Sequence, residues 1–87
     1  MTTAAMKRHM DRVAQLPCCT CGNEPVQLHH VREGQGMAQR ASNWLVVPLC
    51  PSCHTGRHGV HGDKSMMRLK KMTEMDMLAM TLERLAG

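Results

Sequence analysis

The chain has 87 residues and a formal net charge of +4, which allow one small domain with a mild preference for polyanions such as nucleic acid. Aromatic residues make up 1% of it, so the rings that usually fill a core are missing, and a domain this small then needs a staple such as a metal ion. No apolar run approaches the roughly 18 residues of a membrane span. We expect neither a membrane nor a small-molecule cofactor among its partners.

The number of cysteines is odd, at five, and the N-terminal residues form no apolar signal region. These features predict a reducing, cytoplasmic setting. In such a setting, paired cysteine motifs more often bind metal than form disulfides.

The first predicted element is a helix over residues 3–16. Its apolar residues recur near helical spacing, at Met6, Met10, Val13 and Leu16. Pro17 follows and ends the helix. Basic residues lie between the apolar ones, and they indicate either a solvated face on a packing helix or a surface that touches DNA.

Two short β-branched segments, residues 26–31 and 44–47, predict an antiparallel hairpin. The glycine-containing residues 32–42 form the loop between them, and Pro48 closes the second strand. The cysteine pair at residues 50–53 then leads into a short helix.

The C-terminal part predicts two further helices. The first begins at Asp63 or Ser65 and runs to about Met72. Thr73 and Asp76 resemble a capping box, which would start the second helix. Its buried face is predicted from apolar spacing, at Met75, Leu78, Leu82 and Leu85.

Two cysteine clamps predict a structural zinc site. Cys18 and Cys21 form one C-x-x-C motif, and Cys50 and Cys53 form a second after 28 intervening residues. Zn²⁺ prefers tetrahedral thiolate sets of this kind, and a shell of four cysteines leaves no open position for catalysis. Cys19 is the spare thiol, since a Cys19–Cys21 clamp would have the poorer spacing.

Five of the six histidines fall within 33 residues that overlap the second clamp. Adjacent residues of a strand point to opposite faces, so His29 and His30 can have different tasks: one binds a metal and the other acts on water. Zinc would draw His54 close to the hairpin. His58 lies four residues after His54, a spacing that places two ligands on one helical face, although glycines in this segment disfavour a helix.

Several motifs in this order resemble the HNH, or ββα-metal, endonucleases that carry a zinc knuckle. The matching segments are C-x-x-C at residues 18–21, Leu28-His29-His30-Val31, Asn43-Trp44-Leu45 and Leu49-Cys50-x-x-Cys53-His54. Over roughly residues 17–85, the chain is more narrowly similar to small phage-type RecA-dependent nucleases. That likeness is carried by Cys53-His54-Thr55-Gly56, Gly59-Val60-His61-Gly62-Asp63 and Lys71-Met72-Thr73-Glu74-Met75-Asp76.

The resemblance implies an α+β fold: a small, zinc-stapled ββα-metal (HNH) domain with flanking N- and C-terminal helices. The chain would form a single domain over residues 1–87. The N-terminal helix would occupy residues 1–16, the zinc knuckle and ββα core residues 17–62, and the C-terminal helices residues 63–87.

The resemblance also assigns roles to residues. His30 matches the general base that deprotonates the attacking water, and Asn43 matches the asparagine that orients it. His29 and His54 match ligands of the catalytic metal.

For the third ligand, His61 fits the phage-type pattern better than His58, which stays the alternative. Arg40 and Arg57 are candidates for phosphate contacts, though either could be simply solvated.

The implied function is a metal-dependent DNA endonuclease that hydrolyses phosphodiester bonds in phage or bacterial recombination, with the RecA filament as a candidate partner. Its cofactors would be a structural Zn²⁺ and a catalytic divalent cation such as Mg²⁺, although an all-histidine set could also accept Mn²⁺, Ni²⁺ or Zn²⁺. The alternative is a non-catalytic zinc-knuckle module that binds nucleic acid or protein.

Overall fold

The computed structural model describes residues 2–32 and 42–87 and shows a small α+β domain, as predicted. In chain order the elements are α1 (Ala4–Ala14), β1 (Gln27–His30), β2 (Val46–Leu49), α2 (Pro51–His54), α3 (Ser65–Lys70) and α4 (Glu74–Ala86). The two strands form one antiparallel sheet, in which Gln27 lies opposite Leu49 and His30 lies opposite Val46. The predicted hairpin is therefore present.

The second strand begins later than predicted and includes the proline that was expected to end it. Trp44 lies in a turn before β2, with 43% of its surface exposed. Pro48 is a buried member of β2. A proline lacks the N–H that a central strand needs, but each strand of a two-stranded sheet has one free edge, where that loss is tolerated. The Pro48 carbonyl accepts a hydrogen bond from the Cys19 N–H at 3.0 Å.

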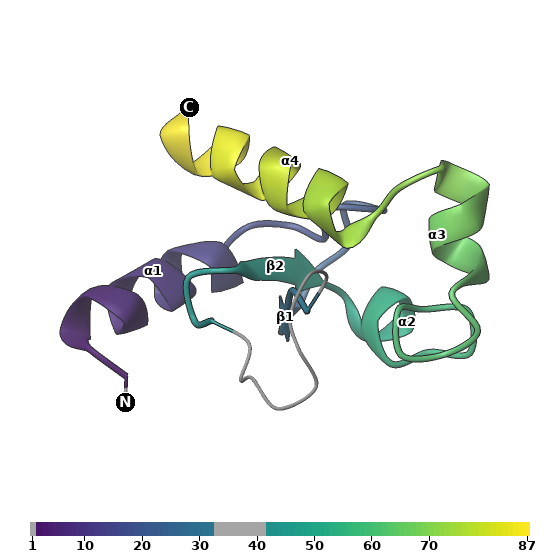
Figure 1. Ribbon diagram of the computed structural model, residues 1–87, viewed down its shortest axis with the longest axis horizontal. Coiled ribbons are helices and arrows are strands. Elements are labelled where there is room, and N and C mark those ends of the chain that lie inside the picture. Colours follow the sequence, from purple (N-terminus) through teal and green to yellow (C-terminus); the bar gives the residue numbers. More distant parts are fainter. Residues whose placement is uncertain (1, 33–41) are drawn as a thin grey trace.

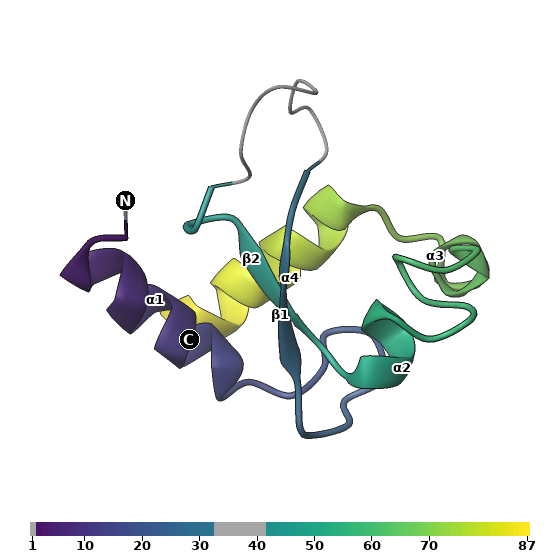
Figure 2. The same ribbon diagram turned by 90° about the horizontal axis from the view of Figure 1, so that it is seen from below.

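The helices surround this hairpin on three sides (Figure 1). α4 lies along one face of the sheet and packs against β2, while α1 packs at one end against both strands. α2 and α3 lie at the opposite end, a separation that Figure 2 shows from below. The Arg12 guanidinium of α1 donates to the Leu85 carbonyl at 3.0 Å and so ties α1 to the last turn of α4.

The buried core contains several cysteine thiols and no aromatic side chain among the described residues. Its members are Cys18, Cys19, Val31, Val47, Leu49, Cys50, Cys53, Val60, Met77 and Leu78. Four of the five cysteines therefore lie inside the core. A metal bound there would connect the segments that form the interior, which suits a chain too short to bury a large apolar surface.

Both long helices begin at threonine caps. The Thr3 hydroxyl accepts a hydrogen bond from the Met6 N–H, which satisfies one of the unpaired donors at the start of α1. At α4, the Thr73 hydroxyl accepts from the Asp76 N–H at 3.1 Å, and the Asp76 carboxylate accepts from the Thr73 N–H at 2.9 Å. The predicted capping box is confirmed.

The predicted buried face of α4 is correct at Leu78 and partly so at Leu85, which is half-buried, but wrong at Met75 and Leu82. The structure buries Met77, Leu78 and Thr81, whereas Met75 is 51% exposed and Leu82 is 47% exposed. A threonine can take a core position here because its hydroxyl donates to the Met77 carbonyl at 2.9 Å. A pattern of apolar residues alone could not place this face, since one of its central residues is polar.

α3 is shorter than predicted and has a left-handed residue at each end. Lys64, before the helix, has a φ of 63°, and Lys71, after it, has a φ of 52°. Residues other than glycine rarely adopt this conformation, because Cβ then crowds the backbone. Within the described residues, no helix has the length and apolarity to cross a membrane.

Candidate metal centres

The first candidate centre consists of the four predicted cysteines. The sulfur atoms of Cys18, Cys21, Cys50 and Cys53 all lie within 4.8 Å of one another. The Cys21 sulfur is 3.5 Å from that of Cys50 and 3.7 Å from that of Cys53. Such a cluster could hold a structural ion such as Zn²⁺, which takes four thiolates in a tetrahedron.

Two backbone turns position these sulfurs. The Gly22 N–H donates to the Cys18 carbonyl at 2.9 Å, and Gly22 has a φ of 77°, which glycine adopts without strain. The second turn is the start of α2, where the His54 N–H donates to the Cys50 carbonyl. Cys19 is buried but stands outside the four-cysteine group, so Cys18 is the partner of Cys21 in the first clamp.

The Thr20 hydroxyl lies between two of the sulfurs, 3.1 Å from Cys18 and 3.0 Å from Cys53. Burial raises the pKa of the Cys18 thiol, but hydrogen bonds from Thr20 and backbone groups lower it to about 6. Burial raises the pKa of Cys53 to about 12. Because Zn²⁺ binds thiolates, the thiols of this cluster would give up their protons when the ion binds, so binding would be pH-dependent.

The second candidate centre consists of three histidines, His29, His54 and His61. One ring nitrogen from each lies within 4.8 Å of the others, and their ring centroids are 4.7 to 5.2 Å apart. They come from β1, from α2 and from the turn that follows α2. The choice of His61 as the third candidate ligand therefore agrees with the geometry.

His54 gives the clearest sign that this group could bind a cation. Its Nδ1 lies 2.8 Å from the Gln27 Oε1. An amide oxygen can only accept, so Nδ1 bears the proton and Nε2 keeps its lone pair. That Nε2 is buried and has no hydrogen-bond partner among the residues that the structure describes. Buried nitrogens of this kind are rare, and a cation would satisfy this one.

His29 is held by a carboxylate. Its Nε2 lies 3.0 Å from Glu74 Oε1, and Glu74 Oε2 accepts from the Arg32 N–H at 2.8 Å. Because the carboxylate accepts, His29 Nε2 carries the proton and Nδ1 has the lone pair. Burial lowers the pKa of His29, although Glu74 opposes this, and burial with neighbouring histidines lowers the pKa of His54. Both rings are thus neutral at pH 7, as metal ligands must be.

His61 depends on a tight turn. The His61 N–H donates to the His54 carbonyl at 3.0 Å, and the Val60 N–H donates to the Cys53 carbonyl at 2.9 Å. A Cβ on Gly59 would lie only 2.5 Å from the Cys53 oxygen. Glycine at this position therefore lets the turn fold back onto α2 and place His61 beside His54.

We expect Gly59→Ala to weaken cation binding at the three histidines roughly tenfold or more, because it pushes His61 away, while zinc stays in place. Calorimetric titration with Mn²⁺ and zinc analysis would measure the two effects. Gly87→Ala is the matched control, since its Cβ would meet no atom closer than 3.4 Å. Equal Mn²⁺ affinity in both variants would show that the turn at Gly59 does not determine cation binding at the three histidines.

His58 does not join the three histidines. Its Nδ1 lies 3.2 Å from the Asp63 carboxylate and 2.9 Å from the Ser65 hydroxyl, and its side chain is 64% exposed. Arg57 is exposed on the same turn. Arg40 lies outside the described residues.

His30 and Asn43 form a separate pair. His30 Nε2 lies 3.1 Å from the Asn43 Oδ1, so the ring donates through Nε2 and its Nδ1 keeps the lone pair. The Asn43 amide donates in turn to the Thr2 hydroxyl at 3.2 Å. Asn43 therefore fixes the ring of His30.

Sequence reasoning missed two side chains that hold the three histidines, Gln27 and Glu74. Gln27 lies two residues before His29, so its side chain is on the same face of β1, and this spacing could have identified it. Glu74 is the first residue of α4, 45 positions after His29. No local pattern could have linked those two residues.

Comparison with known proteins supplies a family. No curated protein and no solved structure matches the chain. Residues 1–85 match the family DUF968, whose description is protein of unknown function. Because this match spans nearly the whole sequence, the chain belongs to the DUF968 family.

Proposed function

We propose that the protein is a metal-dependent DNA endonuclease of the HNH type. The observation that carries this proposal is the convergence of His29, His54 and His61 around the unpartnered, buried Nε2 of His54. A protein that used the four cysteines only to bind a partner would have no need of a second group of ligands. The order hairpin, then short helix, with the paired histidines on β1, supports the same proposal.

The three histidines would hold the catalytic cation. Such a cation polarises the phosphate and stabilises the leaving oxygen. Three neutral imidazoles contribute no negative charge, so the bound cation keeps its full attraction for a phosphodiester. Imidazole favours transition metals, while Mg²⁺ prefers oxygen ligands, which the phosphate and water would contribute.

His30 would act on the water. Its Nε2 is committed to Asn43, so its Nδ1 is the nitrogen that can accept a proton from the attacking water. The anchoring of Asn43 by Thr2 limits rotation of the imidazole, and a fixed base loses less entropy on reaching the transition state. His29 and His30, as neighbours on one strand, would thus divide metal binding and proton transfer between the two faces.

Cleavage of supercoiled plasmid tests the proposal. The wild-type protein would be assayed with Mg²⁺, Mn²⁺, Ni²⁺ and Zn²⁺, with and without RecA filaments, because the sequence resemblance suggests recombination as the setting. We expect cutting to depend on an added cation. His54→Ala should slow it by roughly a thousandfold, since several kcal/mol of metal stabilisation is lost.

His58→Ala is the matched control, because it removes an imidazole four positions away that lies outside the three-histidine group. Its rate should stay within about twofold of wild type, as for most exposed substitutions. Absence of cutting under every condition, with zinc bound and the protein folded, would leave the non-catalytic zinc-knuckle module as the function.

A further inference from the structure

A pocket with a basic rim lies beside the three histidines, and neither metal centre uses it. Its volume is about 610 Å³, and it lies between α3 and the start of α4. Four cationic side chains line it, those of Arg32, Lys64, Arg68 and Lys71, against one carboxylate, Glu74. The pocket therefore has a strong local excess of positive charge, in a chain whose overall net charge is only +4.

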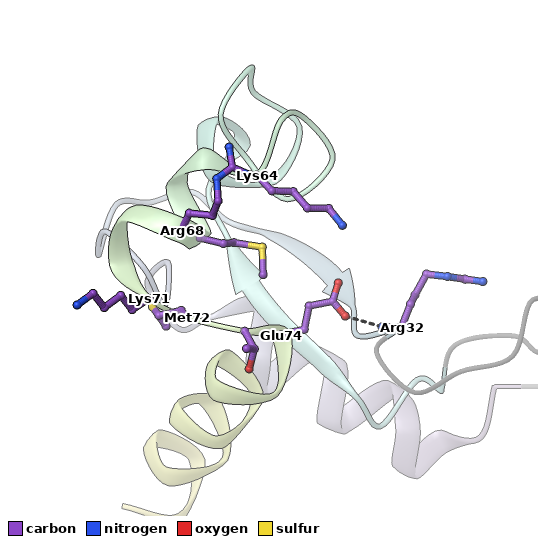
Figure 3. A pocket seen from close by; sticks show the side chains of 8 residues that line it. Arg32, Lys64, Arg68, Lys71, Met72 and Glu74 are labelled. Carbon is purple, nitrogen blue, oxygen red and sulfur yellow. Dashed lines mark hydrogen bonds between the residues drawn. The ribbon is translucent and has the colours of Figure 1, made fainter.

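The cations are spread around the pocket rather than gathered at one point (Figure 3). Lys64 extends over the pocket toward the side on which Arg32 lies, whereas Lys71 points away at the opposite end. Arg68 lies near Lys64. A compact anion such as free phosphate would engage only part of this set. An extended polyanion, with charges at regular intervals, could engage all of it.

The pocket also borders the candidate catalytic centre. Glu74 lines it and at the same time accepts from His29 at 3.0 Å and from the Arg32 N–H at 2.8 Å. One side chain thus separates the pocket from the nearest candidate ligand of the cation. A strand held in the pocket would lead directly to that centre.

The backbone conformation of Lys64 and Lys71 gives an independent indication that this pocket has a function. Both residues have positive φ, at 63° and 52°, where glycine would be less strained. Such residues are held in place by the surrounding structure, as Lys71 is at the C-cap of α3, and they cluster at functional sites. These two lysines stand at opposite ends of α3, and both line the same pocket.

We propose that this pocket binds the phosphodiester backbone of the DNA strand next to the phosphate that is cut. Arg32, Lys64, Arg68 and Lys71, in this order across the pocket, would contact phosphates along the strand, and such contacts carry no base specificity. This inference rests on the proposed nuclease function for its choice of ligand. It adds the path of the strand, from α3 past Glu74 to the histidines.

The test is DNA binding by the double variant Lys64→Gly/Lys71→Gly, in a His30→Ala background that leaves the strand uncut. Binding of a fluorescent DNA oligonucleotide would be measured by anisotropy over a range of salt. We expect Kd to rise on the order of tenfold, and the slope of log K against log salt to shrink by roughly 1.5 to 2, for two lost phosphate contacts. The melting temperature should stay equal or rise, because glycine relieves both positive-φ positions.

The control is Lys7→Ala/Arg8→Ala, which removes the same charge from the exposed side of α1, at the other end of the molecule. Its affinity and salt slope should stay close to those of the His30→Ala protein. Equal weakening in both double variants would mean that net charge alone attracts DNA, and the pocket assignment would fall. Unchanged binding by the glycine variant would also reject it.

An RNA oligonucleotide of the same sequence is the second ligand. Tighter, pocket-dependent binding of RNA would overturn the choice of DNA. The wild-type cleavage assay separates this inference from the proposed function. If the protein binds DNA through the pocket but never cuts it, the pocket assignment stands and the nuclease function is rejected. If the glycine variant binds and cuts DNA like the wild type, the nuclease function stands and the pocket assignment is rejected.

Discussion

Replacement of Cys50 by serine is expected to release zinc and unfold the domain in one step. Structural zinc sites contribute about 10–16 kcal/mol of binding free energy, whereas a small domain has about 5–15 kcal/mol of total stability. Three of the four clustered cysteines, Cys18, Cys50 and Cys53, are core residues, so loss of the ion would release contacts inside the interior. Zinc analysis and circular dichroism would show the two losses together.

Cys19→Ala provides the matched control for this experiment. Cys19 is as buried as Cys50, at 4% exposure, but it stands outside the cluster, and burial raises the pKa of its thiol to about 12. We expect this variant to keep one zinc ion and lose only about 1 kcal/mol of stability. A Cys50→Ser protein that remained folded without zinc would refute the structural role of the four cysteines.

The second large effect is expected for His30→Ala, which should reduce DNA cleavage by about 10²–10⁴-fold. This substitution removes an imidazole whose Nε2 is held by Asn43 and whose Nδ1 has a lone pair that can accept a proton. Zinc content, unfolding temperature and Mn²⁺ binding should stay near wild type, because His30 belongs to neither ligand group. Gel quantification of nicked plasmid would give the rate.

Asn43→Ala distinguishes positioning from proton transfer. This variant frees the imidazole but leaves it present, so its rate should fall less than that of His30→Ala, by roughly tenfold. If His30→Ala cut DNA at the wild-type rate, the base assignment would be excluded, while the metal site would be unaffected. If Asn43→Ala lost as much activity as His30→Ala, the asparagine would have a role beyond orientation.

Local patterns allowed much of the structure to be predicted. The cysteine clamps and the Thr73 capping box depend on residues a few positions apart, whose spacing has direct geometric consequences. Cys18 and Cys21 meet because a turn closes from the Cys18 carbonyl to the N–H of Gly22, directly after Cys21. The two clamps of the four-cysteine cluster could therefore be identified before any tertiary contact was known.

Features that depend on tertiary packing could not be predicted in this way. The buried side of α4 includes Thr81, whose polarity hides its position from a search for apolar residues. The contact between Glu74 and His29 joins the start of one helix to a distant strand. The basic rim likewise gathers Arg32 and Lys64 from separate segments, so their charges meet only in the folded chain.

Cys53 and His54 are neighbours on α2, yet they belong to different candidate ligand groups. In the proposed nuclease, a newly made chain would gain the ability to cut only after four thiols had bound their ion, because the helix that presents His54 also carries Cys53. Loss of that ion would then reduce the proposed activity without altering any histidine.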